Sequence, residues 1–455
     1  MSSFKSFAVI VIVLLFPAPI LAATPDILNI VLTPGRTESE LNFSWQTPVG
    51  AVAEATVQVA LKSDTTREDF AEDKTKTFTG TSANFAGGLV SHKVTVGGLI
   101  PSTDYIYRLG TGRDGEWSDV YGFSTRDGKT FSVLLIGDAQ IGSKNIDDDT
   151  AVWQDTLDKA LQKTSDAAFI ISVGDQVDSS MQGEYDAFLS LSQFKNMPFA
   201  PTLGNHDNSD LFSYYFNMPN EGIARGKTVG DSYYYFVYGN SLFVVINSNY
   251  LDYKRCDEFI RAAVKKNRNA RWKILVMHHS VYGADFPRPA DLAFRKNLVP
   301  IFDKYGIDVV LSGHDHIHVR THFMLNNQIV QPLEKFPAGS KPPEEIPAGA
   351  VIKPKGTIYL SAAAGGTKYY DPASQYFDYN AARLAPYVPM FSRINITDSS
   401  FEILSYRADD MTVADSFIMV KAAAQDNMWT IFMIGLACVL FAALIIWKRR
   451  RLTRI

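Results

Sequence analysis

Short runs of alternating apolar and polar residues fill the first quarter of the chain, from about residue 24 to residue 126. Alternation of this kind is typical of strands with one buried face, and glycine, proline and polar turns separate the runs. The clearest runs are Leu41–Trp45, Ala55–Leu61, His92–Val96 and Tyr105–Leu109. The pattern predicts a small β-sandwich. It holds no cluster of ligand-type residues, so we assign no chemistry to it.

From Lys129 onward, apolar runs typical of buried strands alternate with segments of helical periodicity. Helices are predicted over Ala151–Lys163, Gly183–Lys195, Asp257–Lys266 and Asp291–Lys304. A hairpin is predicted from Tyr233–Tyr238 and Leu242–Ile246 across the turn Gly239–Ser241. The alternation predicts an α/β domain.

The last third of the chain has less regular patterns. Gln331–Ala350 is rich in proline and predicts a mobile surface loop. Three apolar runs should complete the second sheet of the α/β domain, namely Thr357–Ala362, Arg393–Thr397 and Phe401–Tyr406. Residues 408–428 are expected to form a stalk.

Both termini carry export and membrane signals. Met1–Ala23 has one lysine, a short apolar core and small residues at its end, which predicts a signal peptide; an uncleaved anchor is the alternative. Trp429–Trp447 is nineteen residues without a charge, long enough to cross a bilayer. Five cations follow in residues 448–455, so the positive-inside rule predicts a cytoplasmic tail and an exported, single-pass membrane protein. A processed C-terminal sorting signal is the rival, against which the basic tail argues.

Composition narrows the possible partners. The chain is 46% hydrophobic and 20% charged with a net charge of −4, which leaves −9 before the basic tail. This argues against an extended nucleic-acid surface. Only Cys256 and Cys438 are present, and the second lies in the predicted span, so no disulfide framework is expected.

Polar residues follow five of the apolar runs directly. The five blocks are Asp138-Ala139-Gln140, Gly174-Asp175-Gln176-Val177-Asp178, Gly204-Asn205-His206-Asp207, His278-His279 and Gly313-His314-Asp315-His316. The carboxyl ends of strands in an α/β sheet gather at one edge, where ligands bind. In extended chain His314 and His316 would face the same way, as two ligands of one metal site must. The sequence therefore predicts a metal site at this edge.

The order of these blocks, from Asp138 to His316, resembles the calcineurin-like metallophosphoesterase superfamily. The resemblance implies a four-layer α/β/β/α sandwich, here over residues 129–407. The segment Val94–Thr125 resembles the fibronectin-III-like domain that precedes the catalytic domain in purple acid phosphatases. This resemblance implies a fibronectin-III-like domain over residues 24–126.

The resemblance also implies a centre of two metal ions. Asp175 would bridge them, Asp138 and His316 would hold the first, and Asn205, His278 and His314 the second. Gln140 stands where the superfamily usually has histidine; it is either a ligand or a neighbour of the ligands. A glutamine oxygen would favour manganese, magnesium or iron over zinc, and the identity of the two divalent or trivalent ions stays open.

Several neighbouring residues receive roles from the same resemblance. His206 would assist the leaving alcohol. We prefer His278 over His279 as ligand because it lies four residues before Tyr282, as in purple acid phosphatases. Asp178 replaces the tyrosine that colours those enzymes, so no purple colour is expected. His318 and Arg320 either border the substrate pocket or are solvated.

The predicted activity is hydrolysis of phosphate monoesters by attack of a metal-bound hydroxide, with a phosphorylated small molecule or protein as substrate. Two bound carboxylates against two divalent cations leave a surplus of positive charge, which suits a phosphate dianion. Phosphodiester hydrolysis is the first alternative. A non-catalytic adhesion or receptor ectodomain with a metal site is the second. The oligomeric state stays open.

Overall fold

The computed structural model describes residues 27–50, 54–64, 70–110, 117–207, 209–222, 233–249, 251–284 and 287–422. The predicted signal peptide, membrane span and cytoplasmic tail lie outside these residues. Among the residues described, no helix is long and apolar enough to cross a bilayer.

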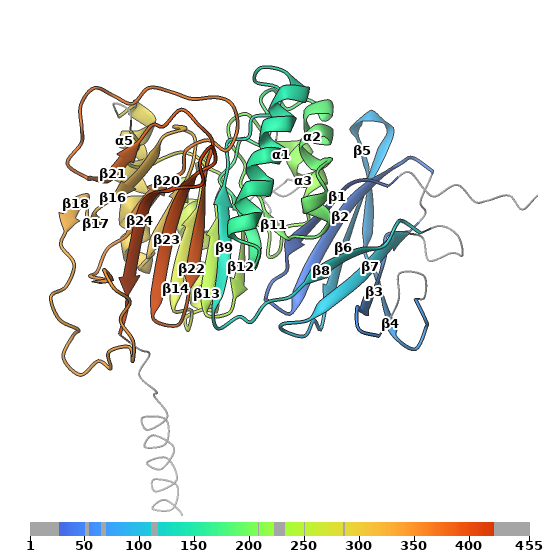
Figure 1. Cartoon of the computed structure of the whole chain (residues 1–455), viewed down its shortest axis with the longest axis horizontal. Helices are drawn as coiled ribbons and strands as arrows, with labels where there is room; N and C mark the ends of the chain where they lie inside the picture. Colours follow the sequence, from blue (N-terminus) through green and yellow to red (C-terminus); the bar gives the residue numbers. More distant parts are fainter. Residues whose placement is uncertain are drawn as a thin grey trace, which may run out of the picture.

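The first quarter of the chain forms the predicted β-sandwich (Figure 1, blue). One four-stranded sheet has the order β1-β2-β6-β5 and the other β4-β3-β7-β8. The strands are β1 (Leu28–Pro34), β2 (Glu40–Pro48), β3 (Thr56–Leu61), β4 (Thr75–Thr79), β5 (Thr81–Phe85), β6 (Leu89–Gly97), β7 (Asp104–Gly110) and β8 (Tyr121–Ser124), with a 3-10 turn η1 (Ala86–Gly88) between β5 and β6. Apolar side chains from both sheets, such as Phe43 and Tyr107, form their common core.

The rest of the described chain is built on two seven-stranded sheets. The first has the order β11-β10-β9-β22-β23-β24-β19 and the second β12-β13-β14-β15-β20-β16-β21. Their strands are β9 (Phe131–Ile136), β10 (Ala167–Ser172), β11 (Phe199–Ala200), β12 (Tyr234–Tyr238), β13 (Ser241–Val245), β14 (Trp272–Val276), β15 (Val309–Ser312), β16 (His318–Thr321), β19 (Val351–Ile352), β20 (Ile358–Ser361), β21 (Asn380–Leu384), β22 (Met390–Ile396), β23 (Ser400–Arg407) and β24 (Val413–Val420). A small hairpin, β17 (Phe323–Leu325) and β18 (Gln328–Val330), lies outside both.

Helices cover the outer faces of the two sheets. One buried cluster joins apolar residues of both sheets with α1, including Leu134, Val276 and Trp153. A second cluster joins the other face of the second sheet to α4, α5 and α6, including Leu275, Ile260 and Phe302. The helices are α1 (Ile146–Lys163), α2 (Gln182–Leu189), α3 (Ser209–Tyr215), α4 (Tyr253–Lys266), α5 (Pro289–Asn297) and α6 (Val299–Tyr305), with a 3-10 turn η2 (Ser192–Lys195). The predicted α/β/β/α order of layers is confirmed.

Two predicted helices are shorter than expected. Gly183–Lys195 ends as an α-helix at Leu189, and η2 follows. Asp291–Lys304 is divided into α5 and α6 around Leu298, and Pro300 lies in the first turn of α6. A proline ring removes a backbone donor and favours the start of a helix over its interior. The predicted hairpin is present as β12 and β13, and residues 331–350 hold no helix or strand.

The prediction of a stalk from residue 408 is wrong, because Val413–Val420 is strand β24 of the first sheet. It pairs antiparallel with β23 and parallel with β19. Four of its eight side chains are half-buried and two are exposed, so the alternation that marks a strand is weak in this segment. The three late strands also do not complete one sheet: β20 belongs to the second sheet, and β22 and β23 belong to the first.

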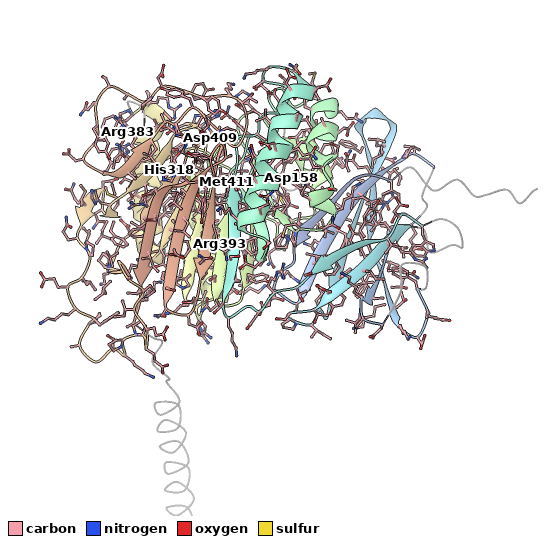
Figure 2. All side chains as sticks on the ribbon, viewed as in Figure 1. Asp158, His318, Arg383, Arg393, Asp409 and Met411 are labelled. Atoms are coloured by element: carbon pink, nitrogen blue, oxygen red, sulfur yellow. The ribbon has the colours of Figure 1, made fainter. Side chains whose placement is uncertain are left out.

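A mostly buried ion cluster attaches β24 to the second sheet. The Arg320 guanidinium donates two hydrogen bonds to the Asp415 carboxylate, at 2.8 and 2.9 Å, and His318 Nε2 lies 3.1 Å from the same carboxylate. His318 (labelled in Figure 2) is 1% exposed. His318 and Arg320 therefore neither border the substrate pocket nor face solvent, which corrects both alternatives drawn from the sequence.

We predict that Asp415→Ala lowers the free energy of unfolding by about 3 kcal/mol, because it leaves the mostly buried Arg320 guanidinium without its partner. Urea denaturation measures the change. Asp409→Ala is the matched control: Asp409 (Figure 2) pairs with Arg407 on the surface, so its loss should change the midpoint little. Equal effects of the two substitutions would contradict this account.

The contribution of Asp415 should also depend on pH. Burial alone would raise its pKa, but the hydrogen bonds from Arg320 and His318 hold the pKa well below the ordinary aspartate value. A carboxyl whose pKa is lowered by folding stabilises the fold above its unfolded pKa, about 3.9, and loses that contribution as the pH falls. The difference between wild type and Asp415→Ala should therefore shrink below about pH 4.

Candidate metal centre

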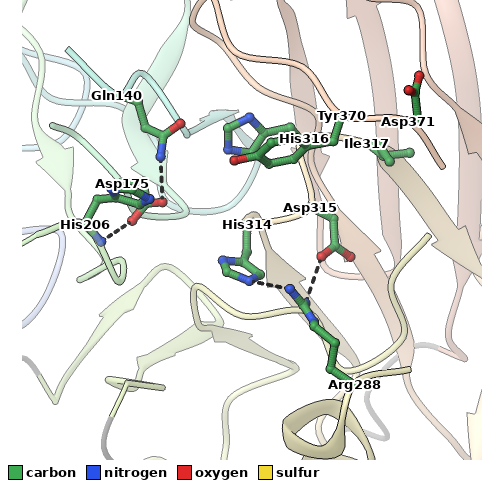
Figure 3. Close-up of a pocket in the computed structure, with 10 residues that line it drawn as sticks. All are labelled: Gln140, Asp175, His206, Arg288, His314, Asp315, His316, Ile317, Tyr370 and Asp371. Atoms are coloured by element: carbon green, nitrogen blue, oxygen red, sulfur yellow. Dashed lines mark hydrogen bonds and ion pairs between the residues drawn. The ribbon is translucent and has the colours of Figure 1, made fainter. Parts of the chain in front are cut away.

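The predicted site residues lie after the carboxyl ends of five strands. Figure 3 shows Gln140, Asp175, His206, His314 and His316 among them. Asp138 and Gln140 follow β9, and Asp175 follows β10. Asn205 and His206 lie in the loop that follows β11, His278 follows β14, and His314 and His316 follow β15. The two sheets therefore deliver their ligand-type side chains to one edge, as the α/β arrangement predicts.

Two groups of side chains are spaced to hold a cation. Asp175, His278 and His314 form one, and Asp138, Asp175 and His316 form the other; within each group the ligand atoms lie within 4.8 Å of one another. His278 Nε2 is 3.3 Å from Asp175 Oδ2, and His316 Nε2 is 3.5 Å from Asp138 Oδ1. Asp175 belongs to both groups, the position predicted for a bridging ligand.

Asn205 joins the first of these groups. Its Oδ1 lies 3.0 Å from His278 Nε2, so an amide oxygen and an imidazole nitrogen face the same point. His279, by contrast, is in neither group: its Nδ1 lies 2.8 Å from Ser248 Oγ. The geometry favours His278 over its neighbour as the ligand.

Two histidines present Nε2 to the centre because their other ring nitrogen is already engaged. His278 Nδ1 donates to the Val173 carbonyl at 2.8 Å, and His316 Nδ1 donates to the Lys368 carbonyl at 2.7 Å. A bond of this type fixes the orientation and tautomer of a metal-binding imidazole. His314 turns Nδ1 toward His278 Nε2, 3.2 Å away, and its Nε2 toward Arg288.

The backbone at the site is strained. Asp138, Gln140, Asp175, His314 and His316 all have φ between 41° and 72°, in the left-handed region. For residues with side chains this conformation costs of order 1–3 kcal/mol each and persists only when surrounding contacts impose it. Here His314 N donates to Asp138 Oδ1 at 3.0 Å and His206 N donates to Asp175 Oδ1 at 2.9 Å, so the loops hold one another.

Glycines let these loops approach closely. A Cβ on Gly204 would lie 2.0 Å from Asp175 Oδ1, and one on Gly313 would lie 2.3 Å from Asp138 Oδ2. Neither distance is possible for a methyl group. The two carboxylates can occupy their positions only because no side chain is present at 204 and 313.

Two buried oxygen atoms at the site, Asp138 Oδ2 and Gln140 Oε1, have no hydrogen-bond partner among the residues that the structure describes. A buried acceptor without a partner costs about 1–3 kcal/mol, so such atoms call for an explanation. Gln140 Nε2 meanwhile donates to Asp175 Oδ2 at 3.3 Å. Oxygen atoms left free beside two carboxylates and three imidazoles fit a metal centre.

Electrostatics also favours a cation here. Burial raises the pKa of Asp138 to about 8. Burial lowers the pKa of a histidine, but the nearby Asp175 carboxylate outweighs this and raises the pKa of His278 to about 9. Burial lowers the pKa of His314 to about 2 and that of His316 to about 4, so both are neutral at pH 7, the form that binds metals.

His206 stands at the edge of the centre and lines the adjoining pocket. Its Nδ1 donates to the Asp178 carbonyl at 2.6 Å, and the same nitrogen lies 3.6 Å from Asp178 Oδ1. Asp178 in turn is 3.4 Å from Lys368 Nζ. Asp178, which replaces the tyrosine of purple acid phosphatases in the sequence comparison above, therefore orients His206 through its backbone carbonyl.

A pocket of about 260 Å³ opens beside the centre and includes residues that the sequence did not reveal. Arg288 is one: it donates to His314 Nε2 at 3.0 Å and pairs with Asp315 at 3.2 Å. Tyr370 is another, with its ring centroid 4.6 Å from that of His316. Ile317, Asp315 and Asp371 complete this wall (Figure 3). No local pattern marks Arg288 or Tyr370, because each reaches the site from a loop.

Comparison with known families agrees with this architecture. Residues 131–318 match the family described as calcineurin-like phosphoesterase, and residues 27–125 match the family described as purple acid phosphatase, N-terminal domain. Human acid phosphatase type 7 is 25% identical over 314 residues, which cover 61% of this chain and 64% of the human protein. An uncharacterized protein of Mycobacterium tuberculosis is 23% identical over 195 residues, 37% of this chain and 35% of that protein. The chain thus spans between about a third and two thirds of the length of these relatives.

A solved structure shares the fold. The purple acid phosphatase PPD1 from yellow lupin seeds superposes with a TM-score of 0.67 at 17% identity, over 88% of this chain and 75% of the lupin chain. At this identity the likeness concerns the fold alone.

We predict that Gly204→Ala weakens metal binding by about ten- to a hundredfold, because the added methyl group displaces the Asp175 carboxylate. Calorimetric titration with Mn²⁺ measures the affinity. Gly183→Ala is the matched control, since a Cβ there meets nothing within 4 Å and the residue lies in α2. Wild-type affinity in Gly204→Ala would contradict the close approach of these loops as a requirement.

Proposed function

We propose that this chain, a calcineurin-like metallophosphoesterase with a purple acid phosphatase N-terminal domain, hydrolyses phosphate monoesters. One observation carries the proposal: Asp175 belongs to both groups of side chains that are spaced to hold a cation. A carboxylate shared in this way is what a two-metal phosphoesterase requires between its ions.

The donor set fits such a centre. Asp138, Asp175 and His316 would hold one ion, and Asp175, Asn205, His278 and His314 the other. Gln140 Oε1, buried and without a hydrogen-bond partner in the described part of the chain, would be a further oxygen ligand of the first ion. Two ions bound there would neutralise the charge of a phosphate dianion and lower the pKa of water to near neutrality. We infer iron, manganese or magnesium rather than zinc at an oxygen-rich first position.

His206 is placed to assist the leaving alcohol. Because Nδ1 is engaged with the Asp178 carbonyl, Nε2 is the ring nitrogen available to a substrate in the pocket. A proton carried at Nε2 makes the ring cationic, and the Asp178 carboxylate lies 3.6 Å from Nδ1. Transfer of this proton to the departing oxygen would avoid release of a free alkoxide.

The pocket favours a small substrate. Its volume of about 260 Å³ is at the low end of ligand pockets, and it lies directly beside Asp175 and His206. Phosphodiester hydrolysis is the second candidate. It is favoured by the extension of the pocket past the metal-binding residues to Arg288, Ile317 and Tyr370, where a second ester group could lie.

We also propose that the enzyme acts outside the cytoplasm as a membrane-tethered protein. The support is in the sequence: the apolar segment Trp429–Trp447, the cations after it, and an N-terminal segment typical of export. The described chain ends at residue 422, shortly before that apolar segment.

The test is to purify the full chain in detergent, reconstitute it with each candidate metal, and measure bound metal together with hydrolysis of p-nitrophenyl phosphate and bis(p-nitrophenyl) phosphate. We expect two ions per chain and faster turnover of the monoester. Faster turnover of the diester would favour the second candidate. Two ions without turnover of either ester would favour a binding role, and no metal after reconstitution would overturn the proposal.

Substitutions separate binding from catalysis in the same assay. Asp175→Asn should lose metal and turnover together, because both cation groups use that carboxylate. His206→Ala should keep both ions while kcat falls by about 10²- to 10⁴-fold. His322→Ala, an exposed histidine, is the matched control and should change neither quantity. Full kcat in His206→Ala would remove that residue from the mechanism.

A further inference from the structure

One face of the N-terminal sandwich is polar yet buried. Along β1, β2 and β6, the apolar side chains of Leu32, Phe43 and Val94 enter the sandwich core. The side chains on the opposite face include Thr33, Asn42, Ser44 and Ser91, each at most 3% exposed. In an antiparallel sheet with one free face, such positions are solvated. This face is instead covered by the phosphoesterase domain.

The covering element is the end of α3 and the residues that follow it. Ser91 Oγ donates to the Tyr214 carbonyl at 2.6 Å, and Ser44 Oγ donates to the Tyr215 carbonyl at 2.7 Å. Thr33 Oγ1 and Asn42 Nδ2 both donate to the Asn217 carbonyl, at 2.5 and 2.9 Å. The last carbonyls of a helix have no partner within it. The sandwich therefore caps the carboxyl end of α3.

The Asn217 side chain also donates hydrogen bonds to the sandwich. Its Nδ2 donates to the Phe43 carbonyl of β2 at 3.2 Å and to the Val94 carbonyl of β6 at 3.1 Å. Phe85, at the end of β5, adds ring contacts to Tyr214 and Tyr215, with centroids 4.9 and 5.4 Å apart. Hydrogen bonds that run in both directions across a mostly buried boundary favour one arrangement of the two domains.

The same segment is connected to the metal centre by a short chain of contacts. The Tyr215 ring stacks on the Tyr185 ring with centroids 4.6 Å apart, and Tyr185 Oη donates to Asp207 Oδ1 at 3.3 Å. The Asp207 carboxylate also accepts from Gly204 N at 2.8 Å and from Gln176 N at 3.1 Å. Asp207 thus clamps the loop of Asn205 and His206 against the loop of Asp175.

We propose that the N-terminal sandwich is a positioning part of the phosphoesterase site rather than a spacer. By capping α3, it fixes Tyr215, and through Tyr185 and Asp207 it holds the backbone that presents Asn205 and His206. Asn217 and Ser44 are the positioning residues. The catalytic consequence rests on the proposed function, while the restraint on the loop does not.

The test compares two hydrogen bonds that cross the same domain boundary. Asn217→Ala removes the two bonds by which the segment after α3 is held to β2 and β6. Tyr107→Phe removes the bond from Tyr107 Oη to the Lys195 carbonyl, 2.7 Å, which lies in another part of the boundary. In the full chain, hydrogen exchange by mass spectrometry follows the amides of Gly204, His206 and Asp207. Kinetics with p-nitrophenyl phosphate gives kcat and KM separately.

In Asn217→Ala we expect the three amides to exchange about five- to tenfold faster and kcat to fall about tenfold with little change in KM. Tyr107→Phe should leave loop exchange and kcat as in wild type. If Asn217→Ala does not fold, Ser44→Ala removes one bond of the same network and should shift the same amides by a smaller factor.

Unchanged loop exchange in a folded Asn217→Ala or Ser44→Ala protein would overturn the proposal. Equal changes in Tyr107→Phe would also overturn it, because they would mean that the sandwich contributes only general stability. Faster loop exchange in a chain whose wild type has no turnover would support the positioning role and overturn only the phosphatase assignment.

Discussion

The shared carboxylate of Asp175 is the point on which the arrangement of the phosphoesterase domain depends. It belongs to both groups of side chains that are spaced to hold a cation, and its Oδ1 accepts a hydrogen bond from the backbone amide of His206. Burial alone would raise the pKa of Asp175, but His278 and the backbone amide of His206 outweigh it and keep that pKa low. The Asp175 carboxylate in turn raises the pKa of His278. A buried carboxylate is costly unless it is paired. The loops around Asp175 supply hydrogen-bond donors and imidazoles. Bound cations would supply the remaining positive charge that the buried carboxylates of Asp138 and Asp175 need.

The proposed ligands can surround one centre only because their backbone takes an unusual conformation. Five of the proposed ligands have left-handed φ values, and the glycines at 204 and 313 leave space in which only hydrogen atoms fit. Such strain is maintained by rigid surroundings. Two sheets with a common core supply part of that rigidity, and the capped end of α3 extends it into the N-terminal sandwich. The geometry of the site therefore depends on the packing of the two domains.

The sequence predicts the proposed metal ligands because each lies in a short segment that follows an apolar run, so its position is set largely by local sequence. Arg288 and Tyr370 reach the pocket from loops whose path depends on distant contacts, and no local pattern marks them. Strand β24 was missed because its half-buried side chains alternate weakly. The interface at Ser44 was missed for the opposite reason: alternation identifies it as the polar face of a strand, but only the tertiary structure shows that a helix covers it.

The most direct test of the central claim is a crystal structure of the manganese-reconstituted protein with anomalous data at the manganese edge. The account predicts two peaks about 3.5–4 Å apart with the Asp175 carboxylate between them, one beside Asp138 and His316 and the other beside His278 and His314. A single peak, or two peaks that do not share Asp175, would contradict it.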